Sequence, residues 1–249
     1  MRRRRERTVA PVARSRHPSR IFDPPPPPDV AQRYLRQFAP AEVIGRPDLF
    51  PRLTAAALFG AADAPLELDI GCATGEFTVE LARRNPRRRY LGIERSAKPL
   101  YRAVAAADRL GLGNILFVKT DFRVLGPLLD PAAFSAVYYH FPPPYLNARH
   151  SRTGIFIPRH LAAVHTAMRP DAFISVMTDA ARTCGLFIEV AAALPFFAVN
   201  TDGPFRLRLD DGLKSFHHRK WEEKGRIVYR MELYPAQAPG QAANAVARR

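Results

Sequence analysis

The chain has 249 residues, of which 47% are hydrophobic, enough for one α/β domain with a core on both faces of its sheet. It contains no run of about 18 apolar residues that could span a bilayer, and the arginines near its start are not followed by the apolar segment of a secretory signal. The two cysteines, Cys72 and Cys184, have no metal-ligand spacing, which predicts free thiols in a reducing, cytoplasmic compartment.

The balance of charge is strongly basic. Lysine and arginine number 38 against 23 aspartate and glutamate residues, which gives a net charge of +15 and a pI of about 10.7. Proteins with such a charge favour polyanions, most often nucleic acid. The alternative is a coding bias, because nearly all the basic residues are arginine, and part of the excess lies in residues 1–20.

The two ends of the chain differ in composition from its middle. Residues 1–28 combine high charge with the proline run 24–28, which predicts a disordered tail. Residues 29–59 have a helical pattern in places, at 31–38 and 54–59, and we expect 29–57 to form a helical N-terminal extension. Residues 235–249 have nothing to bury and predict a second loose tail, which leaves 58–234 as the main domain.

Within 58–234 the apolar pattern alternates between strands and helices. Strands are expected at 66–70, 90–93, 115–118, 136–139 and 173–177, with a final pair at 196–199 and 227–233. Helices are expected at 76–84, 98–110, 158–168 and 182–194. This alternation predicts a Rossmann-like α/β fold, with a mostly parallel seven-stranded sheet and helices on both faces.

A glycine turn follows the first of these strands. The segment 66–77 reads LELDIGCATGEF, so a strand ending in Asp69 runs into a turn whose small residues, Gly71 and Gly75, let a ligand approach the backbone. The spacing differs from the GxGxxG of dinucleotide sites, and Asp69 would repel a phosphate. The turn therefore favours a nucleoside cofactor that carries a cationic amino-acid group.

Two more acids follow the next two strands. Glu94 stands about 20 residues beyond the turn, where a carboxylate can accept both ribose hydroxyls of a nucleoside. Asp121 and Phe122 follow the third strand and fit an adenine edge and face. The alternative is that such acids cap helices or lie on the surface, but acids at the ends of three successive strands favour a cofactor site.

Several segments resemble the tRNA (guanine-N7) methyltransferases. The motifs GEF at 75–77, NP at 85–86 and GIE at 92–94 stand at the distances found in that family. The loop FPPPYLNARH at 141–150 resembles the family's FPDPWPKxRH, and the TD at 178–179 and the segment 221–230 are also similar. The resemblance spans about residues 58–233. It implies a class I methyltransferase that uses S-adenosylmethionine and acts on N7 of a guanosine in the variable loop of tRNA.

The resemblance is weaker where guanine should bind. The family's aspartate falls on Pro143, its lysine falls on Asn147, and the glutamate of its closing T-x-x-E falls on His218. No catalytic acid is therefore assigned. The substrate-binding residues that the resemblance implies are Asn147, Arg149, His150, Asp179, Ser215 and His218.

Alternatives remain open for these residues. Asp179 is either a guanine acceptor or a cap for the helix that follows it. The basic residues around Arg149 and around Arg219 either grip phosphates or form a solvated basic face. The histidines have no partner spacing for a metal site, so none is expected.

Three functions fit the whole pattern. The first is an active tRNA guanine-N7 methyltransferase with a divergent guanine pocket. The second is a methyltransferase of the same descent acting on another RNA base or on a small molecule, and the third is a non-catalytic protein that binds cofactor and RNA. The cofactor acids disfavour the third and the basic charge disfavours a small acceptor, whereas the oligomeric state stays open.

Overall fold

A computed structural model describes residues 24–143, 154–210 and 212–236. Its strands are β1 (Leu35–Gln37), β2 (Leu66–Ile70), β3 (Arg89–Glu94), β4 (Ile115–Lys119), β5 (Phe134–His140), β6 (Ile174–Thr178), β7 (Phe197–Asn200) and β8 (Tyr229–Pro235). The α-helices are α1 (Pro28–Tyr34), α2 (Pro40–Gly45), α3 (Ala55–Phe59), α4 (Glu76–Arg84), α5 (Ala97–Arg109), α7 (Pro158–Ala167), α8 (Ala181–Ala192) and α9 (Phe216–Glu223). Short 3₁₀ turns are η2 (Pro47–Leu49), η3 (Phe122–Val124) and η4 (Gly126–Leu128).

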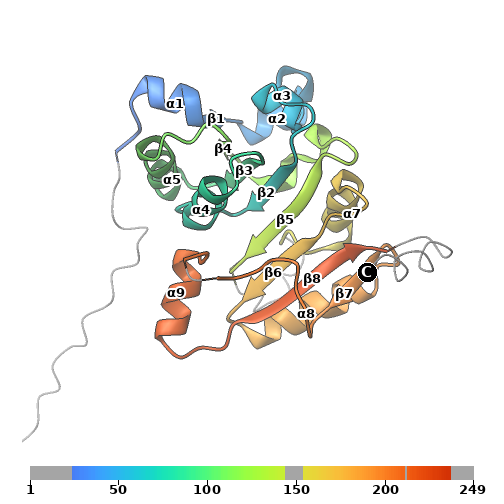
Figure 1. The fold of residues 1–249 in the computed structure, drawn as a ribbon. Coiled ribbons are helices and arrows are strands. Elements are labelled where there is room, and N and C mark those ends of the chain that lie inside the picture. Colours follow the sequence, from blue (N-terminus) through green and yellow to red (C-terminus); the bar gives the residue numbers. More distant parts are fainter. Residues whose placement is uncertain (1–23, 144–153, 211, 237–249) are drawn as a thin grey trace, which may run out of the picture.

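The strands form one sheet in the order β1-β4-β3-β2-β5-β6-β8-β7 (Figure 1). All neighbours from β1 to β6 pair in parallel, whereas β8 runs antiparallel to both β6 and β7. The chain moves outward from β2 through β3 to β4 and then returns to β5 on the other side of β2. The order therefore reverses between β2 and β5, and a ligand crevice is expected at the carboxyl ends of these strands.

The N-terminal strand β1 corrects the expected number of strands from seven to eight. Residues 31–38 were expected to be helical, but the helix ends at Tyr34 and Leu35–Gln37 pairs in parallel with residues 117–119 of β4. Tyr34, Leu35 and Phe38 are all buried, and their spacing also fits one face of a helix. Pairing with the distant strand β4 makes residues 35–37 a strand, and the local sequence pattern carries no information about that pairing.

Helices cover both faces of the sheet, as the alternation predicted. On one face α4 and α5 pack with α1 over strand residues such as Tyr90 and Phe117. On the other face α8 packs against β6, β7 and β8, and residues of α7 share a buried cluster with residues such as Leu91 and Val118. Because neighbouring residues of a strand point to opposite faces, the continuous apolar runs of β3 and β4 serve both cores.

The antiparallel pair at the end of the domain was also predicted. Residues 227–233 were expected as a strand and β8 spans Tyr229–Pro235, beside β7 at Phe197–Asn200. Within the described residues, no helix has the length and apolar character needed to cross a bilayer.

Candidate functional site

The glycine turn lies at the carboxyl end of β2, between the strand and α4. Gly75 has a φ of 68°, and a Cβ at this position would lie 2.4 Å from the Cβ of Ala103, so only glycine fits where α4 approaches α5. Gly71 has a φ of 79°, and a Cβ there would meet nothing within 4 Å. The space beside the Gly71 backbone is therefore open, and the approach of a ligand there stays a prediction.

Asp69 is buried beneath this turn and has no basic partner among the residues that the structure describes. The Thr78 hydroxyl donates to the Asp69 carboxylate at 2.5 Å, and Asp69 is 5% exposed. Burial raises the pKa of Asp69 to about 7, the charge of Glu94 acts in the same direction, and the hydrogen bond from Thr78 opposes both. A cation bound nearby would stabilise the charged form of Asp69.

Glu94 joins the end of β3 to the glycine turn. The backbone N–H groups of Ala73 and Ser96 donate to its two carboxylate oxygens, at 3.3 Å and 2.8 Å. The turn is further fixed because the N–H groups of Gly71 and Cys72 donate to the carbonyl of Ile93. Each oxygen of Glu94 keeps a lone pair for another donor, which suits ribose hydroxyls.

Asp121 follows β4 and caps η3, because its carboxylate accepts the N–H of Arg123 at 3.0 Å. Burial raises the pKa of Asp121, but hydrogen bonds from Arg123 and the charges of Arg123 and Arg95 hold that pKa below its usual value. The capping role considered for strand-end acids is thus observed here. Phe122 is 5% exposed and packs in the core, so its predicted contact with adenine stays a prediction.

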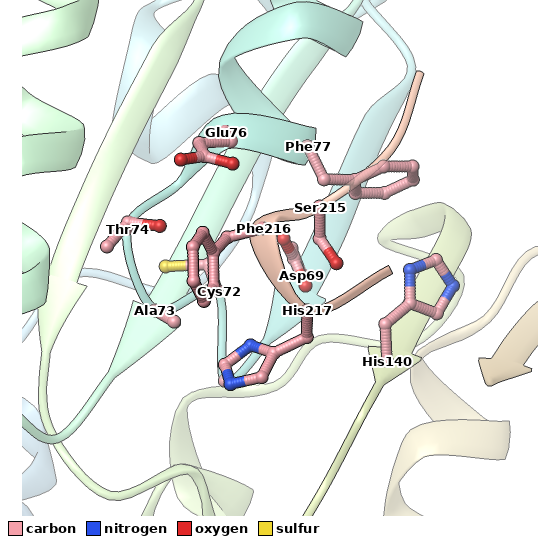
Figure 2. Close-up of a pocket in the computed structure, with 11 residues that line it drawn as sticks. Asp69, Cys72, Ala73, Thr74, Glu76, Phe77, His140, Ser215, Phe216 and His217 are labelled. Carbon is pink, nitrogen blue, oxygen red and sulfur yellow. The ribbon is translucent and has the colours of Figure 1, made fainter. Parts of the chain in front are cut away.

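A small hollow of about 30 Å³ lies over Asp69 and the turn (Figure 2). Figure 2 shows Thr74 and Glu76 on one side of it and His140, at the end of β5, on the other. The start of α9 contributes further walls. The lining residues are Asp69, Gly71, Cys72, Ala73, Thr74, Glu76, Phe77, His140, Ser215, Phe216 and His217.

The sequence reading missed His140. Its Nε2 lies 3.0 Å from the Ser175 hydroxyl, and its buried Nδ1 has no hydrogen-bond partner within the described parts of the chain. Burial lowers the pKa of His140 to about 3, and the charges of His218 and Arg230 add to this effect, so the ring is neutral at pH 7. The available signal was a polar residue at the carboxyl end of an apolar strand, directly before the loop at 141–150.

The start of helix α9 forms one wall of the site. Ser215 caps the helix by accepting the N–H of His218 at 3.2 Å, and Arg219 forms an ion pair with Glu76 at the start of α4. His218 is 4% exposed and its ring lies 5.7 Å from that of Phe141. Its Nδ1 has no hydrogen-bond partner among residues 24–143, 154–210 and 212–236. Burial lowers the pKa of His218, against the charge of Glu222. A neutral His218 offers one ring nitrogen where the family has a carboxylate.

Asp179 does not cap α8. That helix begins after Ala180 without a side-chain cap, and the N–H of Ala180 donates to the Thr178 hydroxyl instead. Asp179 is paired with Arg226, whose Nη1 lies 2.7 Å from its carboxylate. The capping alternative is therefore wrong in this structure.

The structure does not describe the remaining residues that were predicted to bind the substrate. Asn147, Arg149 and His150 lie outside the described residues. Pro143 is described and exposed, at the start of the same loop. Across residues 24–143, 154–210 and 212–236, no group of three His, Cys, Asp or Glu side chains is placed to hold a metal ion.

Comparison with known proteins gives three results. A family model described as "Putative methyltransferase" matches residues 63–231. Relatives named tRNA (guanine-N(7)-)-methyltransferase, from Chloroherpeton thalassium and Rubrobacter xylanophilus, are both 36% identical to this chain. The alignments cover 88% and 84% of this chain, and 97% and 93% of the relatives.

Solved structures agree on the fold. The 16S rRNA methyltransferase KamB matches with a TM-score of 0.52 at 16% identity, covering 76% of this chain and 96% of that one. The antibiotic-resistance methyltransferase Kmr matches with a TM-score of 0.50 at 14% identity, covering 74% and 94%. These matches support a class I methyltransferase fold.

Proposed function

Because this chain belongs to the tRNA (guanine-N7)-methyltransferase family, we propose that it methylates N7 of a guanosine in the variable loop of tRNA, with S-adenosylmethionine as methyl donor. The observation that carries the proposal is the alignment with relatives of that name, which covers 97% of one of them. The glycine turn and the acids of β2 and β3, which the matching methyltransferase family model spans, meet at one end of the sheet.

The residues at the sheet edge fit the proposed cofactor. Asp69 is a buried carboxylate without a basic partner, which suits the positive charge of a sulfonium or ammonium group. The open backbone at Gly71 and the helix start at Gly75 would take the methionine end, and the free lone pairs of Glu94 would take the ribose. Asp121 and Phe122 would adjoin the adenine. The bound cofactor supplies an activated methyl group.

Transfer to N7 makes few chemical demands on the protein. Guanine N7 carries a lone pair and no proton, so no general base is needed. The chain contributes orientation and exclusion of water, effects that account for much of enzymatic catalysis. The start of α9 lies over the glycine turn and is held there by the ion pair between Arg219 and Glu76. In this position it would exclude water from the site.

Guanine recognition is assigned to the residues that match the family's substrate positions in the sequence. These are Ser215, which caps α9, His218 within α9, and Asp179, which directly follows β6. We further assign Asn147, Arg149 and His150 of the 141–150 loop to the substrate side. A carboxylate accepts two donors of the guanine edge at once, whereas neutral His218 accepts one. Selectivity for guanine is therefore expected to be lower than with the family's full set.

A second candidate function rests on Pro143 and His218. Both positions lack the carboxylate that the family places there, which favours a methyltransferase of the same descent with another acceptor base. The cofactor site would be unchanged in that case, and only the methylated atom would differ.

Nucleoside analysis separates the two functions. Unmodified tRNA is incubated with the protein and S-adenosylmethionine, digested to nucleosides and examined by mass spectrometry. N7-methylguanosine that is lost when the variable-loop guanosine of the transcript is replaced supports the first proposal. A different methylated nucleoside with no N7-methylguanosine supports the second.

A further inference from the structure

A cluster of cations surrounds the indole of Trp221, at the carboxyl-terminal end of α9. The side-chain nitrogens of Lys220 and Lys224 lie 4.5 Å and 5.4 Å from the ring centre, and the guanidinium carbon of Arg226 lies 4.2 Å from it. We call these four residues the Trp221 platform. The indole holds the cations by its electron-rich faces and adds no negative charge.

Two of the platform's charges are not neutralised by any carboxylate. Arg226 is paired with Asp179 at 2.7 Å, but neither Lys220 nor Lys224 lies within 4.0 Å of an acidic group in the described parts of the chain. Lys224 and Arg226 are exposed, and Lys220 is half-buried. Three like charges crowded around one ring repel each other, and an anion placed among them would relieve that repulsion.

The platform stands on the rim of the candidate site. Arg226 ties it to Asp179, which directly follows β6, and α9 begins at the hollow with Ser215. Figure 1 shows α9 beyond the tips of β2 and β5. An acceptor strand that approaches the hollow along α9 would pass close to these cations.

We propose that the Trp221 platform is a binding site for the phosphate backbone of the RNA substrate, with Lys220 and Lys224 as its free cations. The proposal rests on the proposed function, since it takes RNA as the acceptor. Such contacts position the substrate without reading its sequence. Binding at the platform should therefore depend on salt and be indifferent to the methylated base.

The test compares variants of the full chain in binding an unmodified tRNA transcript across a series of salt concentrations. Lys220→Gln combined with Lys224→Gln should weaken binding about tenfold near 0.1 M salt and reduce the salt slope by about two, roughly one for each lost phosphate contact. Trp221→Leu keeps the three charges but removes the ring that holds them in place. It should therefore weaken tRNA binding by a smaller factor of about three and leave the salt dependence of binding unchanged.

A matched control removes two charges from the opposite edge of the sheet. Arg87, which precedes β3, and Arg109, which ends α5, are both exposed. The double variant Arg87→Gln with Arg109→Gln should bind tRNA as the wild type does. S-adenosylmethionine affinity, measured by calorimetry, should be equal in all variants and confirms that each one folds.

Two outcomes separate the platform from the proposed function. If the wild type methylates tRNA but the double lysine variant binds tRNA as well as the control does, the platform proposal is overturned. If the wild type forms no methylated nucleoside in tRNA and does not bind it, the proposed function fails and the platform proposal falls with it.

Discussion

Replacing Glu94 by alanine tests the cofactor site most directly. In the structure this carboxylate accepts the N–H of Ala73, in the glycine turn, and that of Ser96, and it has lone pairs left for a ribose. The change Glu94→Ala removes all these acceptors together. We expect it to weaken S-adenosylmethionine binding far more than it weakens the fold.

The magnitude follows from the number and kind of hydrogen bonds lost. A hydrogen bond to a charged group contributes about 1.5–3 kcal/mol, and a partly exposed N–H that loses its partner is compensated by water. Loss of the ribose contacts should therefore weaken cofactor binding by about 2–3 kcal/mol, which is a factor of roughly 30 to 150 in Kd. The two backbone donors lie near the surface, so the free energy of unfolding should fall by only about 1 kcal/mol.

Isothermal titration calorimetry of the purified variant with S-adenosylmethionine gives the Kd. Glu94→Gln is the matched control, because it keeps one acceptor oxygen without the charge and should fall between wild type and Glu94→Ala. Thermal denaturation of both variants without cofactor measures the loss of stability separately. An unchanged Kd in a folded Glu94→Ala protein would refute the assignment of Glu94 to the ribose.

Three further predictions concern the turn, the buried acid and the guanine pocket. Because burial raises the pKa of Asp69 to about 7, the affinity for the cationic cofactor should rise as pH increases through 7, and calorimetry should find this dependence lost in Asp69→Asn. Gly75→Ala should lower the free energy of unfolding by about 2–4 kcal/mol in denaturant titration, because its methyl group would clash with Ala103 at a positive φ. Pro143→Asp with His218→Glu restores the family's carboxylates and should raise kcat/KM for N7-methylguanosine formation.

Each of these predictions has its own control or refuting result. Gly113→Ala meets no atom within 4 Å and should leave stability nearly unchanged, so equal losses at both glycines would contradict the packing argument. A cofactor affinity that does not change between pH 6 and 8 would contradict the role of Asp69. For the guanine pocket, a well-folded double variant that gains nothing on tRNA would favour a pocket refitted for another acceptor.

The convergence of the residues proposed for the cofactor could be predicted because these residues are local in sequence. Asp69, Gly71 and Gly75 lie within one strand-turn-helix segment, and Glu94 ends the next strand, so the parallel pairing of β2 and β3 brings them together. The register confirms this geometry, since Asp69 lies beside Gly92 and Ile70 beside Ile93. Parallel strands with known ends determine which residues share an edge.

The contacts that close the site could not be predicted in this way. Arg219 and Glu76 are 143 residues apart, and no periodic pattern links them. Asp179 looked like a helix cap because it precedes α8, yet its carboxylate pairs with Arg226, which is 47 residues away. His140 was overlooked because its significance comes from burial and from an unpartnered ring nitrogen, which only the packed structure provides.

The lengths of the outermost strands affect how this protein behaves at high concentration. The sheet ends on one side in β1, with three residues, and on the other in β7, with four, whereas β3, β5 and β8 have six or seven. An edge strand presents unpaired N–H and C=O groups on which a second molecule can add a strand, and a short edge presents few of them. By pairing with β4, the segment that was expected to be helical leaves little edge for molecules to join side by side into aggregates.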